Sequence, residues 1–217
     1  MPAIALGKGN ANCSRGQIKL ATIPYSIWTI YLDPLCLVSM PEATDYSFLW
    51  GNKMSRYPKE RLLRLGHSED TLPAGDKLPD EVRPIYTGSV EHCFPGIPRY
   101  SELVFDDLGP DVQLLVLGRA PIMPDWIYVM HLELGGIYIL NIENHERMLV
   151  NSTLWAFVEF LSAMTQFFNA NPRTETWAES AEILKAWMNM VDSRAFQEFP
   201  ELSSWWVTIL KRLQAPR

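Results

Sequence analysis

Hydrophobic and polar positions divide the chain into an irregular first part, a middle part with strand-like runs and a helical last third. The middle part contains three apolar runs that are typical of strands: Gln113–Gly118, Trp126–Leu132 and Gly136–Ile142. The first is continuously apolar, as in a strand buried on both faces, and the second is rich in aromatic and β-branched residues. A shorter run at Leu103–Phe105 predicts a further strand. The last two long runs are joined through Gly135 and Gly136, which indicates a hairpin, so we expect an antiparallel meander.

The last third predicts three helices. The first is expected over Leu154–Phe168, and because its apolar side chains extend beyond one stripe, it should be buried on more than one side. Asn151 or Ser152 precedes it and is expected to accept hydrogen bonds from the free amides of its first turn. The second helix should begin near Thr176, in a capping-box pattern, and the third should follow Ser204.

The first part of the chain is less regular. Residues 46–66 predict one or two helices with basic flanks. The stretch Ser68–Pro98 is rich in proline, glycine and charge, and predicts loops with short strands. Met40 would make a plausible chain start, so we expect residues 1–39 to be a dispensable extension. Strands followed by helices place the chain in the α+β class.

Charge is unevenly distributed in this chain, whose net charge is −6. The segment from Asp76 to Asp111 carries eight acidic and three basic side chains, a net charge of −5, whereas Lys53–Arg64 carries five bases and a single acid. Both segments have an ordinary interpretation as solvated surface, and the acidic one has a second, as a surface that steers a basic partner. General nucleic-acid binders carry an excess of positive charge, so we expect no direct nucleic-acid partner.

The sequence lacks the usual motifs of catalysis and cofactor binding. Its four histidines include no pair at i, i+4 spacing, and there is no HExxH, Gly-x-Ser-x-Gly, GxGxxG or Walker pattern. His131 falls late in an apolar strand, where we expect a histidine whose hydrogen bonds are satisfied within the core. We therefore expect no metal, no cofactor and no enzymatic activity.

Cysteine use and the apolar run near the start bear on location. The three cysteines are widely spaced and form no CxxC pair, which suits a reducing compartment. The apolar run Leu20–Leu32 is interrupted by Pro24 and is too short to span a bilayer. We therefore expect a cytoplasmic protein with no membrane partner.

From Phe48 onward, short motifs follow one another in a specific order: Trp50-Gly51, Arg56–Leu62, Leu115–Gly118, Ile137–Leu140, Leu149–Leu154, Met190–Phe196 and Ser204–Leu210. In this order and spacing they resemble the bacterial immunity proteins of the SUKH superfamily. The resemblance covers about three quarters of the chain. The clearest motif is the Val-Asn-Ser-Thr-Leu helix start, which contains Asn151 and Ser152 and follows a strand ending at Gly118.

The resemblance implies both a fold and a role. The fold is a twisted, mostly antiparallel sheet with helices packed alongside, formed by residues 48–217, with residues 1–47 as an N-terminal extension. The role is to bind and neutralise a cognate protein toxin, often a nuclease or deaminase domain. Gly118, Asn151 and Ser152 are then structural motif residues.

A toxin that acts on nucleic acid needs a cationic groove, so an inhibitor benefits from acids that face it. We hypothesise that four acids of the loop-rich segment form the toxin-facing surface: Glu102, Asp106, Asp107 and Asp111. Two other interpretations stay open. One is a regulatory or scaffolding protein of the same fold with a host protein partner, and the other is an enzyme whose residues converge only in space.

Overall fold

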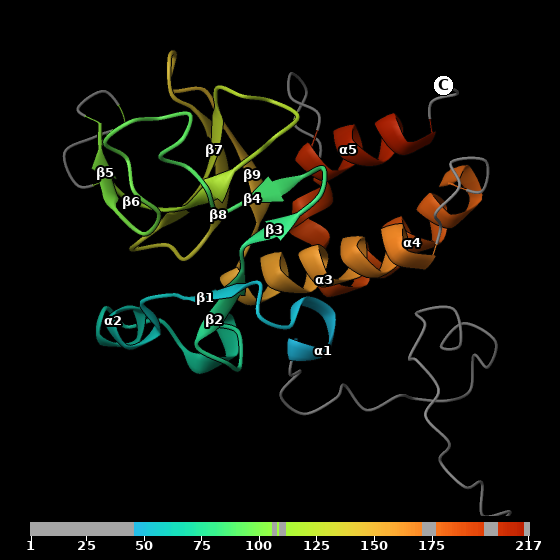
Figure 1. The fold of residues 1–217 in the computed structure, drawn as a ribbon, viewed down its shortest axis with the longest axis horizontal. Helices are drawn as coiled ribbons and strands as arrows, with labels where there is room; N and C mark the ends of the chain where they lie inside the picture. Colours follow the sequence, from blue (N-terminus) through green and yellow to red (C-terminus); the bar gives the residue numbers. More distant parts are fainter. Residues whose placement is uncertain (1–45, 106–107, 109–111, 171–176, 198–203, 215–217) are drawn as a thin grey trace, which may run out of the picture.

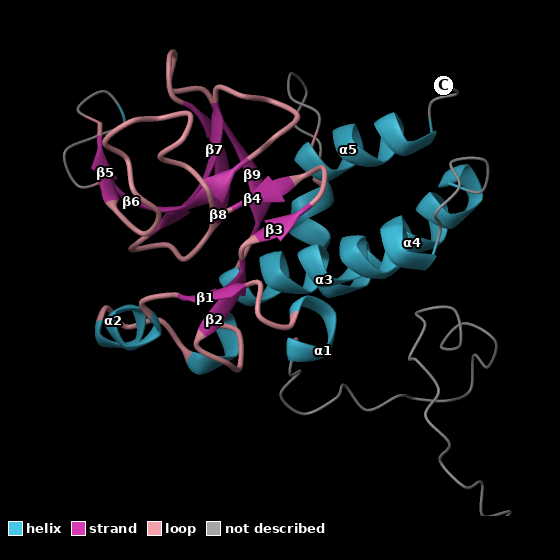
Figure 2. Ribbon diagram, in the orientation of Figure 1, coloured by secondary structure: helices cyan, strands magenta, loops and turns pink. Residues whose placement is uncertain are grey.

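The computed structural model describes residues 46–105, 108, 112–170, 177–197 and 204–214. Within these residues the chain is α+β, as predicted, with helices packed alongside an antiparallel sheet (Figures 1 and 2). The extension expected over residues 1–47 lies outside the described residues, apart from Tyr46 and Ser47.

All strand pairs of the main sheet are antiparallel. Its described strands are β3 (Glu81–Val82), β4 (Tyr86–Thr87), β5 (Glu102–Val104), β6 (Gln113–Arg119), β7 (Trp126–His131), β8 (Ile137–Asn141) and β9 (Arg147–Asn151). They follow the order β3-β4-β6-β7-β8-β9. Strands β4 and β5 pair with opposite ends of β6, β4 at Arg119 and β5 along residues 113–115.

Strands β6, β7 and β8 form the predicted meander, and each lies within one residue of its predicted bounds. The pairing of β7 with β8 confirms the hairpin. Gly135 in its turn has a φ of 76°, a conformation that glycine adopts without strain. The fourth predicted strand is present as β5, whereas β9 was not predicted from the sequence pattern.

The sheet separates two apolar cores. Alternate residues of β6 point to opposite faces, so Leu115 and Leu117 join the larger core with the helices. Leu114 and Val116 join the smaller core, which the segment between β4 and β6 covers, with Val90 buried at its centre. Both faces of β6 are therefore covered, which explains the continuous apolar run in the sequence.

Three helices and a short 3-10 helix follow the sheet: α3 (Leu154–Ala170), α4 (Trp177–Val191), η5 (Ser193–Phe196) and α5 (Trp205–Gln214). Helix α3 is buried on several sides, as predicted, because Phe157, Val158 and Ala163 point in different directions around the helix and are all buried. Among the helices in the described part of the chain, none combines the length and the apolar character needed to cross a bilayer.

The first turn of α3 is capped by Thr153, so the prediction that Asn151 or Ser152 caps it was wrong. The Oγ1 of Thr153 accepts a hydrogen bond from the amide of Ala156 at 3.0 Å. The N-cap position directly precedes the helix, which begins at Leu154. Asn151 is instead the last residue of β9, and its side chain forms hydrogen bonds with distant parts of the chain.

The N-terminal part of the fold packs below the main sheet in the view of Figure 1. It contains α1 (Ser47–Trp50), β1 (Met54–Arg56), α2 (Lys59–Arg64), the 3-10 helix η2 (Glu69–Thr71) and β2 (Lys77–Pro79). The two predicted helices are present, and the strand β1 between them was not predicted. Hydrogen bonds from Tyr46 to Glu159 and from Trp50 to Thr165 attach this part to α3.

Candidate partner-binding surface

Of the four acids expected on a partner-facing surface, Glu102 is the one that the structure describes. It lies exposed on β5 and forms an ion pair with Arg61 of α2. Asp106, Asp107 and Asp111 lie outside the described residues. The pair joins the acidic segment of the sequence to the basic one, so this surface presents both signs of charge.

The ion pair between α2 and β5 belongs to a closed chain of contacts at one end of the sheet. Val104 of β5 pairs in register with Gln113 of β6. The carbonyl of Gln113 accepts a hydrogen bond from the amide of Leu132 at 2.9 Å, and the carbonyl of Leu132 lies 2.7 Å from Nε2 of His67. Because His67 closely follows α2, these contacts hold α2, β5, the start of β6 and the turn after β7 together.

Three large apolar side chains are exposed on these elements: Leu65 at 52%, Val104 at 56% and Leu134 at 68%. The described residues contain two other large apolar side chains of comparable exposure, Phe48 and Met190, on α1 and α4. Apolar side chains that gather on a surface with charged neighbours are typical of interaction sites. We call the following five residues the rim surface: Arg61, Leu65, Glu102, Val104 and Leu134.

An open hollow of about 330 Å³ lies at β1 and α2, next to the rim surface. Arg61 belongs to both. Four basic and two acidic side chains line the hollow, giving it a net charge of +2 in a protein whose net charge is −6. We call it the basic hollow, and its charged lining residues are Arg56, Lys59, Glu60, Arg61, Arg64 and Asp76.

The loop before β2 is fixed against the basic hollow by Tyr57 and Lys59. The hydroxyl of Tyr57 donates to the carbonyls of Pro73 and Gly75, both at 3.2 Å. The ammonium of Lys59 donates to the carbonyls of Pro73 and Ala74, both at 2.8 Å. Burial raises the pKa of Tyr57 further above neutral pH, where its hydroxyl is already a donor. One wall of the hollow is therefore held by several hydrogen bonds.

The three arginines of the hollow differ in their partners. Arg56 pairs with Asp76 at 3.2 Å, and the two side chains are 81% and 54% exposed. Arg61 pairs with Glu102 in a less exposed contact. Arg64 is exposed, and no carboxylate of the described residues lies within ion-pair distance of it.

A second histidine near the rim surface, His131, also contacts the backbone. His131 is buried, as predicted for a satisfied core histidine, and its Nδ1 accepts hydrogen bonds from the amides of Glu133 and Leu134 at 3.3 and 3.2 Å. Burial lowers the pKa of His131, and the charge of Arg147 lowers it further against the opposing effect of Glu133.

Across the ranges that the structure describes, there is no group of acidic, histidine and cysteine side chains arranged to hold a metal ion.

Gly118 lies at a close approach between β4 and β6, next to an irregularity in the pairing of β6 with β7. A Cβ at this position would lie 2.5 Å from Cε2 of Tyr86 and 2.6 Å from the carbonyl oxygen of Thr87. Both distances are shorter than van der Waals contact, so glycine is required here. Gly118 is thus a packing residue.

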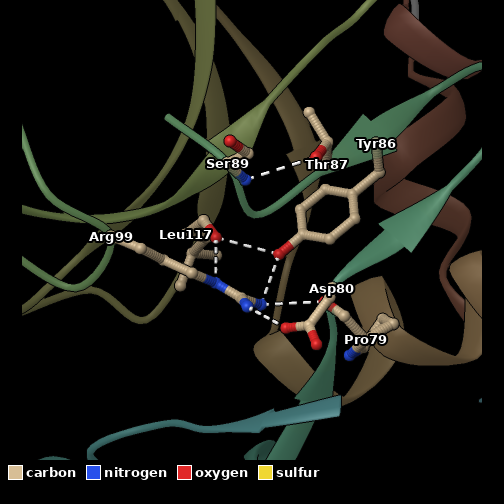
Figure 3. A network of polar contacts seen from close by, with 7 residues as sticks. All are labelled: Pro79, Asp80, Tyr86, Thr87, Ser89, Arg99 and Leu117. Carbon is tan, nitrogen blue, oxygen red and sulfur yellow. Dashed lines mark hydrogen bonds and ion pairs between the residues drawn. The ribbon is translucent and has the colours of Figure 1, made fainter. Parts of the chain in front are cut away.

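The aromatic ring beside Gly118 belongs to a buried polar network around Arg99 (Figure 3). The guanidinium of Arg99 donates to Asp80 at 2.8 Å, to the carbonyl of Pro79 at 2.8 Å and to the carbonyl of Leu117 at 3.0 Å. It also donates to the hydroxyl of Tyr86 at 2.8 Å. The Arg99 side chain is only 12% exposed, and this network fixes β2, β4 and β6 together. No local pattern around Arg99 predicts this network.

Asn151 and Ser152 form a second network that local sequence patterns do not reveal. The side-chain amide of Asn151 donates to Asp192 at 3.2 Å, and the backbone amide of Ser152 donates to the same carboxylate at 2.7 Å. The indole of Trp206 donates to the carbonyl of Val150 and to Oδ1 of Asn151, both at 3.1 Å. Asn151 is fully buried, so it acts in the core and not on the surface.

No protein-family model, curated protein or solved structure matches this chain. The resemblance to the SUKH immunity proteins therefore stays a prediction from the motif residues.

Proposed function

We propose that the chain is a non-enzymatic protein that neutralises a cognate protein toxin by binding it, and that the rim surface contacts the toxin. The observation that carries this proposal is the exposure of Leu65, Val104 and Leu134 on contacting elements. Protein interfaces combine apolar side chains with a charged periphery, and Arg61 with Glu102 provides such charges here.

The position of β5 supports the same surface. It pairs with β6, and its other edge has no strand partner among the residues that the structure describes. Both terminal residues of β5 are exposed. An open strand edge can accept a strand from a partner, with main-chain hydrogen bonds giving affinity and exposed side chains giving specificity.

In this proposal the bound chain blocks access of the substrate to the active site of the toxin. It needs no cofactor and no bond-forming chemistry on the inhibitor. The motif resemblance favours a nuclease or deaminase domain as the partner. In this proposal the two proteins meet in the cytoplasm, away from the membrane.

The test begins with co-purification of the tagged chain with the products of its flanking genes. Leu134→Asp should weaken the isolated complex at least about fivefold, since truncation or charge at an interface anchor costs more than about 1 kcal/mol. Met190→Asp is the matched control, because it places the same charge at an equally exposed apolar position on α4. Equal affinities for the two variants would refute the rim surface as the contact. A regulatory protein as the captured partner would favour the scaffolding alternative.

A further inference from the structure

We infer that the basic hollow binds carboxylate groups of an acidic segment in the protein partner. This inference rests on the proposed function, because it assumes that the chain binds a protein through this side of the molecule. It goes beyond that proposal by stating which groups of the partner bind next to the rim surface, namely carboxylates.

The local charge of the hollow is opposite to that of the whole chain. Four basic side chains face two acidic ones around a space of about 330 Å³. Counting Glu102 against Arg61 still leaves one positive charge in excess. A protein of net charge −6 repels an acidic peptide over most of its surface, so attraction to one has to come from a local site such as this one.

The hollow already binds carboxylates from its own chain. Arg56 pairs with Asp76 and Arg61 pairs with Glu102, whereas Arg64 has no carboxylate among its described neighbours. The planar guanidinium matches a carboxylate with two parallel hydrogen bonds. Arg64 therefore offers a carboxylate-binding group that the described chain leaves available.

A partner can also replace one of the existing pairs. The Arg56 and Asp76 side chains are 81% and 54% exposed, and a pair so exposed contributes little to stability. Exchanging Asp76 for a carboxylate of the partner thus costs little, and Arg56 and Arg64 together can hold two neighbouring acids. The carbonyl contacts of Lys59 keep its positive charge close to both arginines.

The position of the hollow relative to the apolar residues defines the expected partner sequence. Arg64 and Leu65 are consecutive, so a bound acidic segment would lie directly beside the rim surface. We expect the partner to present one or two acidic residues next to an apolar one that contacts Leu65.

The experiment uses the full chain and a fluorescein-labelled hexaglutamate peptide, with binding followed by fluorescence anisotropy at low salt. Arg64→Glu should weaken binding by about three- to tenfold, the range expected for reversing one exposed charge. Arg212→Glu is the matched control, since it reverses an exposed arginine on α5 and changes the net charge equally. Thermal midpoints of both variants should fall by a similar small amount, because each arginine lies in the last turn of its helix.

Three results would overturn the inference. The first is an equal effect of the two arginine variants, and the second is the absence of peptide binding by the wild type. The third is displacement of the peptide by hexathymidylate at lower concentrations than by unlabelled hexaglutamate, because this would assign the hollow to phosphate groups. In the complex with the natural partner, loss of affinity in Leu134→Asp but not in Arg64→Glu would retain the proposed function and reject the acidic segment.

Discussion

Asp192 accepts a hydrogen bond from the side chain of Asn151 at 3.2 Å, although 41 residues separate them in the sequence. The same carboxylate accepts a hydrogen bond from the backbone amide of Ser152. The Oδ1 of Asn151 in turn accepts a hydrogen bond from the indole N–H of Trp206. The end of β9, the end of α4 and the start of α5 therefore meet at one buried amide. An amide suits this position because it donates on one side and accepts on the other.

Replacing Asn151 with alanine should lower the free energy of unfolding by about 1–3 kcal/mol, because buried polar partners lose hydrogen bonds that water cannot replace. Urea denaturation gives this difference directly. Asn52→Ala, at an exposed position, should leave stability nearly unchanged. Weaker partner binding by Asn151→Ala at unchanged stability would instead identify Asn151 as a contact residue.

The order of strands and helices could be predicted from the sequence where a buried face imposes a pattern. Strand β6 and helix α3 are examples. Because β6 is buried on both faces, its residues form a continuous apolar run, and because α3 is buried on several sides, its apolar residues extend beyond one stripe. Strand β1 could not be predicted, because its three residues are partly or fully exposed and depend on pairing with β2. The cap of α3 was misassigned because Asn151, Ser152 and Thr153 are all residue types that cap helices, and only Thr153 directly precedes the helix.

The candidate site was less accessible to sequence analysis than the fold. Glu102 was predicted as a surface acid, and its exposure on β5 agrees. Its ion pair with Arg61 could not be predicted from the sequence, because the pair depends on how α2 packs beside β5. The rim surface could not be predicted for the same reason. Leu65, Val104 and Leu134 belong to three separate segments and share no sequence pattern.

Gly118→Ala should destabilise the fold by about 1–3 kcal/mol, the cost of overpacking a tight contact. The added methyl group would lie 2.6 Å from the carbonyl of Thr87, a backbone atom that cannot move without shifting β4. Gly75→Ala is the matched control, because a Cβ at that position has no neighbour closer than 4.0 Å. If the thermal midpoints of the two variants agree within error, β4 moves enough to accommodate the methyl group and the prediction is wrong.

Arg99→Ala should lower stability by about 2–4 kcal/mol, because it removes the guanidinium donor of the Pro79 carbonyl and one of the two side-chain donors of the Leu117 carbonyl. Asp80 contributes less to this loss, since it is 40% exposed and water can replace the guanidinium. Arg99→Lys should recover only part of the loss, because one ammonium cannot reach all four acceptors. Arg83→Ala, which removes an exposed ion pair with Glu81, should have little effect in the same chemical denaturation series.

Stability should decrease on acidification because of His131. Burial lowers the pKa of His131 in the folded protein below its ordinary value, whereas the unfolded chain titrates near that value. Between the two pKa values the unfolded state binds more protons, so the contribution of His131 is complete above its ordinary pKa and is lost as the pH falls towards the lowered one. The physical cause is that Nδ1 must stay unprotonated to accept the amides of Glu133 and Leu134.

Urea denaturation between about pH 7.5 and about pH 5 measures this loss, since the interval spans the ordinary pKa of histidine. His131→Gln should be less stable than the wild type at neutral pH and should show a flatter dependence of stability on pH across the interval. His92→Gln is the matched control, because His92 is exposed in the loop after β4 and its replacement should preserve the wild-type slope. A wild-type slope that persists in His131→Gln would assign the acid sensitivity to other groups and contradict the role given to His131.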